Sequence, residues 1–182
     1  MKHTAIVALM LGMSVAGVYA QESPVQMTFS GDASASTIDL KQPGTNTSEE
    51  NLAGNGSLGQ FTFRLVKAST TAPQPSSNCS GPTKLFFANV AGGGLFRFQD
   101  GSLLNVILTG GGDCIDFVAG EAHCTMSFQI VGGTGRLQGV SGVLTLTETA
   151  RPILADAFNN PVFFTETGEL AGTVSRGGNS RP

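Results

Sequence analysis

The sequence predicts an all-β protein folded as a single antiparallel barrel of about eight strands, and three observations lead to this expectation. Apolar residues recur at every second position in several segments, which is the period of a strand with one buried face. Glycine is abundant, with 25 residues in 182, and glycine pairs separate the alternating segments as turns would. No segment keeps a helical apolar period over three turns. A β-sandwich is the alternative, but closing a barrel removes exposed sheet edges.

The first 20 residues have the pattern of a signal peptide. Lys2 supplies a cationic start, residues 5–11 form a short apolar run, and small residues lead up to Ala20. The run is too short to span a bilayer permanently, and no later stretch is apolar enough to do so. We therefore expect cleavage after Ala20 and a secreted or periplasmic protein.

The remaining segment, 21–182, has the length of one domain. The whole chain has a formal net charge of -3, which becomes -4 once Lys2 is removed with the predicted signal peptide. A mildly acidic chain without a basic run has no electrostatic surface for nucleic acid. Nucleic acid is therefore not an expected partner, and neither is an anionic membrane surface.

Two segments show the strand period most clearly. In residues 60–65, Phe61, Phe63 and Leu65 share one face, and in residues 123–130 the even-numbered positions from Cys124 to Ile130 are apolar. Further strands are predicted at 25–30, 85–90, 94–98, 102–109, 142–149, 162–167 and 169–175. The count suggests an antiparallel barrel or sandwich.

Polar composition predicts loops over 31–57 and 67–84. Both stretches are rich in Ser, Thr, Asn, Gly and Pro, and neither has enough apolar residues for a buried face. The tail, 176–182, is expected to be frayed for the same reason. No internal repeat is visible, so one domain remains the simplest organisation.

The three cysteines predict a disulfide, because an exported chain meets an oxidising compartment. Cys114 and Cys124 are symmetric about Ala119, as opposed residues of two strands joined by a turn would be, and we expect them to be bonded. Cys79 would then be free or would pair between chains. The expected bond sends Ile115 to the face opposite Cys114, which requires a bulge or a second covered face.

Metal and cofactor sites are not expected. Cys79, Cys114, His123 and Cys124 are ligand types that zinc prefers, but His123 and Cys124 are strand neighbours that point to opposite faces. His123 is also the only histidine after residue 20, and its polar neighbours place it on the wet face. Catalysis by a Ser-His-Asp or Cys-His arrangement is therefore disfavoured.

Two glutamates are candidate acids or bases. Glu148 shares strand parity with Leu144 and Leu146, and Glu166 shares it with Phe164. If these apolar residues face a barrel interior, both carboxyl groups point inward, where desolvation raises the pKa. The alternative is a solvated rim, because each glutamate lies toward the end of its predicted strand.

A glycine-rich turn, Gly132-Gly133-Thr134-Gly135-Arg136, joins an apolar strand that begins at Met126 to a strand of small residues. This arrangement resembles the dirigent and allene oxide cyclase-like barrels, in which an aromatic residue usually follows the basic one. Leu137 stands at that place here. Residues 98–104 are similar to an earlier strand pair of the same families, so the likeness covers about residues 98–149.

The resemblance implies an eight-stranded antiparallel barrel with an apolar interior. Plant members of these families guide radical coupling or cyclise an epoxide with polar groups inside the barrel. Those groups have no position-by-position match in this chain. The absence of Tyr and Trp after residue 20 disfavours any mechanism that needs a phenol in the pocket.

The expected function is binding of an apolar small molecule inside the barrel, with Met126, Phe128, Leu144 and Leu146 lining the site. One alternative is a cyclase or isomerase that uses Glu148 or Glu166. Another is a structural or surface-interaction protein with a filled barrel, whose polar loops make the contacts.

Overall fold

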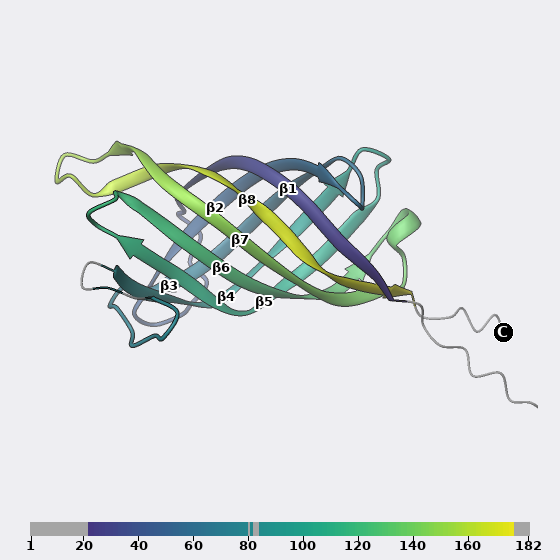
Figure 1. Cartoon of the computed structure of the whole chain (residues 1–182), viewed down its shortest axis with the longest axis horizontal. Coiled ribbons are helices and arrows are strands. Elements are labelled where there is room, and N and C mark those ends of the chain that lie inside the picture. Colours follow the sequence, from purple (N-terminus) through teal and green to yellow (C-terminus); the bar gives the residue numbers. More distant parts are fainter. Residues whose placement is uncertain (1–21, 80, 82–83, 177–182) are drawn as a thin grey trace, which may run out of the picture.

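A computed structural model describes residues 22–79, 81 and 84–176 as one closed antiparallel barrel (Figure 1). The strands follow chain order as β1 (Glu22–Ala35), β2 (Thr45–Gly56), β3 (Phe61–Thr70), β4 (Lys84–Phe98), β5 (Leu103–Asp116), β6 (Glu121–Gly133), β7 (Val140–Ala155) and β8 (Pro161–Arg176), with a short 3₁₀ turn, η1 (Gly135–Leu137), between β6 and β7. The predicted all-β barrel is confirmed. The predicted signal peptide, 1–20, and tail residues 177–182 lie outside the described residues.

Pairing of the first strand with the last closes the barrel. Met27 on β1 lies opposite Gly56 on β2 and also opposite Leu170 on β8. All other neighbours in the sheet are consecutive in sequence, and the strands run obliquely around the barrel (Figure 1). Among the described residues, no helix is long and apolar enough to span a bilayer.

Both stretches predicted as loops contain strands instead. The prediction for 31–57 is wrong because β1 continues to Ala35 and β2 begins at Thr45, which leaves only 36–44 as a connection. The prediction for 67–84 is wrong at its start, where β3 continues to Thr70. The connection from β3 to β4 therefore spans 71–83.

The half of the barrel where β1 begins and β8 ends is packed with apolar side chains. Phe63 stacks on Phe96 with ring centroids 3.9 Å apart, and Phe128 meets Phe63 edge-on at 6.0 Å. Leu65, Met126, Leu144 and Leu146 lie in the same buried cluster. The period-two patterns of β3 and β6 thus mark inward positions, as predicted.

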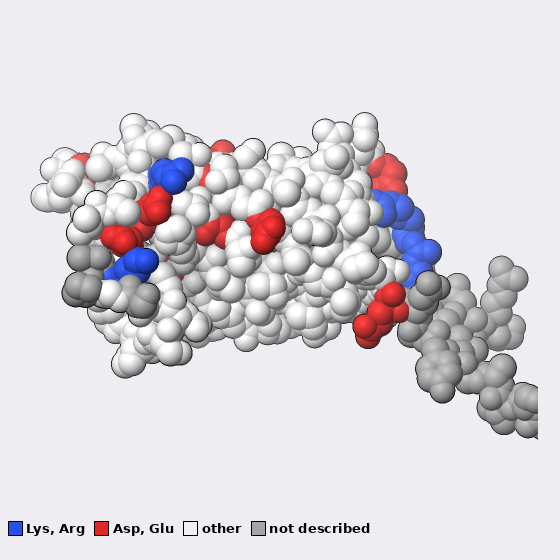
Figure 2. All heavy atoms as spheres, viewed as in Figure 1, with Lys and Arg blue, Asp and Glu red and all other residues white. Residues whose placement is uncertain are grey.

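The outer wall is sparsely charged. On the face that Figure 2 shows, the Lys and Arg side chains lie only near the two ends of the barrel, and a few acidic side chains lie on the wall between them. At the end with η1, Arg136 pairs with Asp100 and donates a hydrogen bond to the Leu58 carbonyl. These contacts join the β6–β7 connection to two neighbouring hairpins.

The disulfide joins Cys79 to Cys114, so the predicted bond between Cys114 and Cys124 is wrong. The register of β5 and β6 places Cys114 opposite His123 and places Asp113 opposite Cys124. Cys114 therefore faces outward with the exposed His123, while Cys124 is a free, buried cysteine inside the barrel. Cys79 and Cys114 are bonded to each other and cannot serve as zinc ligands.

Replacing Cys79 or Cys114 with Ser should lower the free energy of unfolding by roughly 3 to 4 kcal/mol. The bond closes a loop between cysteines 35 residues apart, and without it that loop regains its conformational freedom in the unfolded chain. Urea unfolding followed by circular dichroism measures the loss. The double variant should lose no more than either single variant, since the bond is already absent. Equal stability of wild type and single variants would contradict the assignment.

Candidate functional site

A cavity of about 330 Å³ lies in the half of the barrel where β1 ends and β8 begins. The ends of all eight strands contribute to its wall. Phe87, Ile115 and Phe164 lie nearer the open strand ends, whereas Glu50, Lys67 and Glu166 lie deeper along their strands. The cavity thus has apolar side chains among the residues at its mouth and ionisable side chains at its floor.

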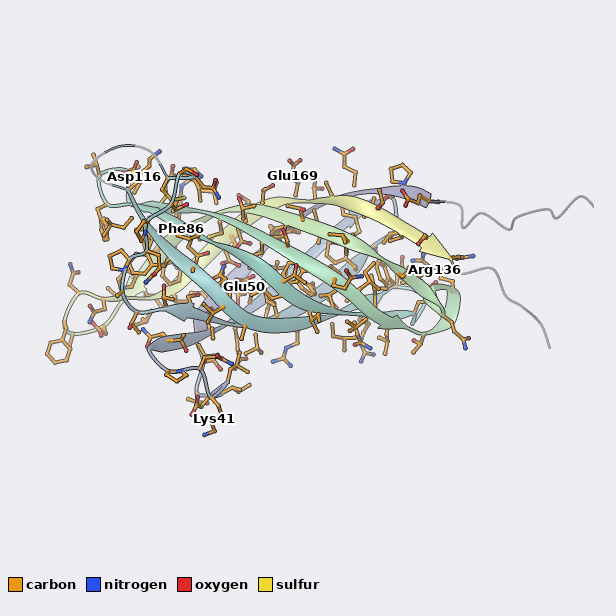
Figure 3. All side chains as sticks on the ribbon, turned by 90° about the horizontal axis from the view of Figure 1, so that it is seen from below. Lys41, Glu50, Phe86, Asp116, Arg136 and Glu169 are labelled. Carbon is orange, nitrogen blue, oxygen red and sulfur yellow. A yellow bond between two sulfur atoms is a disulfide. The ribbon has the colours of Figure 1, made fainter. Side chains whose placement is uncertain are left out.

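Seven inward-facing side chains, one from each of the strands β2 to β8, form what we call the polar layer. Its members are Glu50, Lys67, Asn89, Asp113, Cys124, Glu148 and Glu166. Glu50 precedes the core residue Leu52 by two positions, and Lys67 follows Leu65 by two, so strand parity turns both inward. Figure 3 shows Glu50 inside the barrel, far from Arg136 at the other end.

Lys67 is paired on one side of this layer. Its Nζ lies 2.7 Å from Oε1 of Glu50 and 3.4 Å from Oδ1 of Asp113. Asn89 donates a hydrogen bond of 3.3 Å to the same Asp113 oxygen, and the Ser69 hydroxyl donates one of 2.6 Å to the Asn89 side-chain oxygen. Glu50 and Asp113 are therefore stabilised by a local network.

The other side of the layer lacks such partners. The residue exposures of Glu50, Glu148 and Glu166 are 1%, 5% and 3%, which excludes the solvated rim considered for the last two. Among the described residues, neither oxygen of Glu148 has a hydrogen-bond partner, nor do Oε2 of Glu166 and Oε2 of Glu50. One carboxyl oxygen from each glutamate lies within 4.8 Å of the others. Three buried carboxyl groups thus converge.

Burial controls the protonation of the two predicted glutamates. It raises the pKa of Glu148 to about 8, and the charge of Glu50 acts in the same direction. Burial, followed by the charges of Glu50 and Glu148, raises the pKa of Glu166 to about 10. Both side chains therefore hold a proton at neutral pH.

The charged pair in the layer responds differently. Burial raises the pKa of Glu50, and Lys67 only partly opposes this effect. Burial also acts to lower the pKa of Lys67, but the carboxylates of Asp113 and Glu50 outweigh it and raise that pKa well above its usual value. Burial raises the pKa of the Cys124 thiol well above its usual value, with Asp113 as the next cause.

The four residues predicted to line a ligand site lie in the packed half of the barrel. Met126, Phe128, Leu144 and Leu146 are fully buried in the apolar core, and none of them lines this cavity. The inward direction predicted for Glu148 and Glu166 is confirmed.

Glu50 and Lys67 were missed because they fall in the stretches assigned to loops, although their parity with Leu52 and Leu65 was a usable signal. His123 is outside the layer, on the wet face as predicted. Its Nε2 lies 3.1 Å from a Glu121 carboxyl oxygen, and its side chain is half exposed.

The polar layer makes stability fall as pH rises from 5 to 8. An unfolded glutamate titrates near 4.5, while folded Glu148 keeps its proton until about pH 8. The unfolded state therefore binds fewer protons in this window, so the free energy of unfolding declines, by at most about 1.4 kcal/mol per pH unit for each group. Glu166 and Glu50 act with the same sign.

Glu148→Gln should flatten this decline, because it removes one of the titrating groups. Urea unfolding at pH 5, 6.5 and 8 measures the effect, with Glu169→Gln on the exposed face of β8 as the control. Parallel pH curves for wild type and Glu148→Gln would contradict the expectation.

The chain matches no protein-family model and no curated protein sequence. Among solved structures, it is similar to the pterocarpan synthase dirigent protein GePTS1, with a TM-score of 0.35 and 12% sequence identity. The alignment covers 92% of this chain and 98% of that protein. The similarity is weak, and the two chains are only loosely alike as barrels.

Proposed function

We propose that this protein binds a small molecule in the cavity at the open end of the barrel. The observation that carries the proposal is the contrast between the two halves of the interior. One half is packed with apolar side chains, whereas the other holds a cavity of about 330 Å³ above buried carboxyl oxygens without partners. Leaving such groups unsatisfied costs about 1 to 3 kcal/mol each, which favours a binding role over a purely structural one.

The lining narrows the chemistry of the ligand. The cavity is at the lower end of the range for ligand sites, which is about 300 to 1,000 Å³, so the ligand is small. Phe87, Ile115 and Phe164 offer apolar contacts, while the oxygens of Glu50 and Glu166 accept hydrogen bonds. The ligand that fits both ends has an apolar body and a donating end, such as an amine or a hydroxyl. A purely apolar ligand would leave the floor unsatisfied.

The enzyme alternative uses the same cavity. A cyclase or isomerase would place its substrate beside Glu166, which lines the cavity, rather than beside Glu148, which does not. This alternative stays a prediction. A structural protein with a filled barrel is disfavoured, because a cavity of about 330 Å³ remains inside the barrel.

Binding of hexylamine, followed by isothermal titration calorimetry, tests the proposal. Ala150 is buried and lines the cavity, so Ala150→Phe should fill part of it and weaken binding at least tenfold. Val143→Phe is the matched control, because Val143 lies on the same strand and is exposed on the outer wall. Native mass spectrometry of protein from its own host should also show a bound small molecule. Equal hexylamine affinity in both variants would refute the cavity as the site.

We also propose that the chain is exported and works in an oxidising compartment. The bond between Cys79 and Cys114 supports this, since such bonds persist mainly outside the cytosol. Cleavage after Ala20, as the sequence predicts, would leave Gln21 as the mature N-terminus. N-terminal sequencing of protein recovered outside the host cytoplasm should therefore begin at Gln21. An intact Met1 in that material would overturn the export proposal.

A further inference from the structure

The three buried glutamates of the polar layer have carboxyl oxygens without hydrogen-bond partners, and an organic ligand need not satisfy all of them. We propose that Glu50, Glu148 and Glu166 form a binding site for a hard divalent cation, with Ca²⁺ as the best match. This inference goes beyond the proposed function, and it holds whether or not the cavity takes an organic molecule. It also differs from the prediction made from the sequence, which included no metal site.

The geometry of the three carboxyl groups suits one ion. Ca²⁺ binds oxygen at about 2.4 Å, so two oxygens on opposite sides of the ion are about 4.8 Å apart. One oxygen from each glutamate lies within 4.8 Å of the others, so all three fit a single coordination sphere. Mg²⁺ demands a stricter octahedron and is usually held by only one or two carboxylates, so a set of three carboxylates suits Ca²⁺ better.

A second observation is the state of Glu148. Its side chain is buried, points into the cluster and has no hydrogen-bond partner for either oxygen among the described residues. Glu166 Oε2 lacks a partner as well. Lys67 forms its ion pairs with Glu50 and Asp113, and no ion pair within the described barrel reaches Glu148 or Glu166. A bound cation would satisfy these oxygens.

Charge balance supports the same assignment. The polar layer holds the carboxyl groups of Glu50, Asp113, Glu148 and Glu166 against the single ammonium of Lys67. When all are ionised, the layer has a formal charge of -3, and a divalent ion reduces it to -1. Carboxylate oxygens are ligands that hard cations prefer over soft ones. Glu50 and Glu166 line the cavity, which offers a path for the ion and room for water ligands.

The test uses the full chain, stripped with EDTA and dialysed, and titrated separately with CaCl₂, MgCl₂ and MnCl₂. Calorimetry should show one Ca²⁺ per chain with higher affinity than Mg²⁺, and the electron paramagnetic resonance signal of free Mn²⁺ should decrease on binding. Glu148→Gln and Glu166→Gln should each weaken Ca²⁺ binding at least tenfold. Glu169→Gln, an exposed glutamate on the same strand as Glu166, should change it less than twofold (Figure 3).

Thermal unfolding with and without CaCl₂ gives an independent readout that also reports whether each variant folds. Ca²⁺ should raise the melting temperature of wild type and of Glu169→Gln, and should leave both polar-layer variants unchanged. Absence of Ca²⁺ binding at millimolar concentration would overturn the proposal. So would binding that survives in both Glu148→Gln and Glu166→Gln, because the ion would then lie elsewhere.

Discussion

The antiparallel pairing of β1 with β8 determines where every other interior side chain can lie. It extends from Glu22 opposite Ser175 to Ser34 opposite Phe163, and it joins the first strand of the chain to the last. With eight strands the width of the interior is limited, so the size of the inward side chains decides whether each level is filled or open. Phenylalanine, leucine and methionine fill one half, whereas Ala33, Ala122 and Ala150 leave space in the other. The cavity is thus a direct result of small residues on a fixed circumference.

At the boundary between these halves, carboxyl groups outnumber positive charges, and protons, a cation or a ligand can each compensate for the excess. The polar layer has four carboxyl groups but only one lysine, which pairs with two of them, and an ionised carboxylate without a partner is strongly disfavoured in a buried site. At neutral pH, bound protons neutralise the carboxyl groups of Glu148 and Glu166. A divalent ion or the donating end of a ligand would instead compensate for the excess of carboxyl groups by contacting their oxygens. The same deficiency of positive charge therefore underlies the pH response and both proposals.

The sequence predicted the barrel well where the inward residues are large and apolar. Strands β3 and β6 alternate Phe, Leu, Met and Ile with polar residues, so their period is visible. At the start of β2 the inward positions are Asn46, Ser48 and Glu50. Small or polar residues at inward positions give the segment the composition of a loop. Part of the half that holds the cavity was hidden for this reason, because a polar interior removes the contrast on which the pattern depends.

Two further features show how register limits such predictions. Glu148 and Glu166 were found because they continue the parity of clear apolar neighbours. The cysteine pairing was missed because the turn between β5 and β6 has four residues, which moves Cys114 by one position relative to Cys124. A shift of one residue sends a side chain to the other face of a sheet. The residue types alone do not indicate the length of that turn.

The same shift places the free thiol of Cys124 and the disulfide of Cys114 on opposite faces of the barrel wall. Cys124 is inside the wall and the bridged Cys114 is outside it, so the free thiol can attack the bridge only when β5 and β6 separate. Burial also raises the pKa of the Cys124 thiol, which keeps the reactive thiolate scarce. A chain that forms this hairpin before oxidation is directed to one bridge. A chain oxidised earlier can join any two of its three cysteines, so the order of strand pairing and oxidation decides which isomer accumulates.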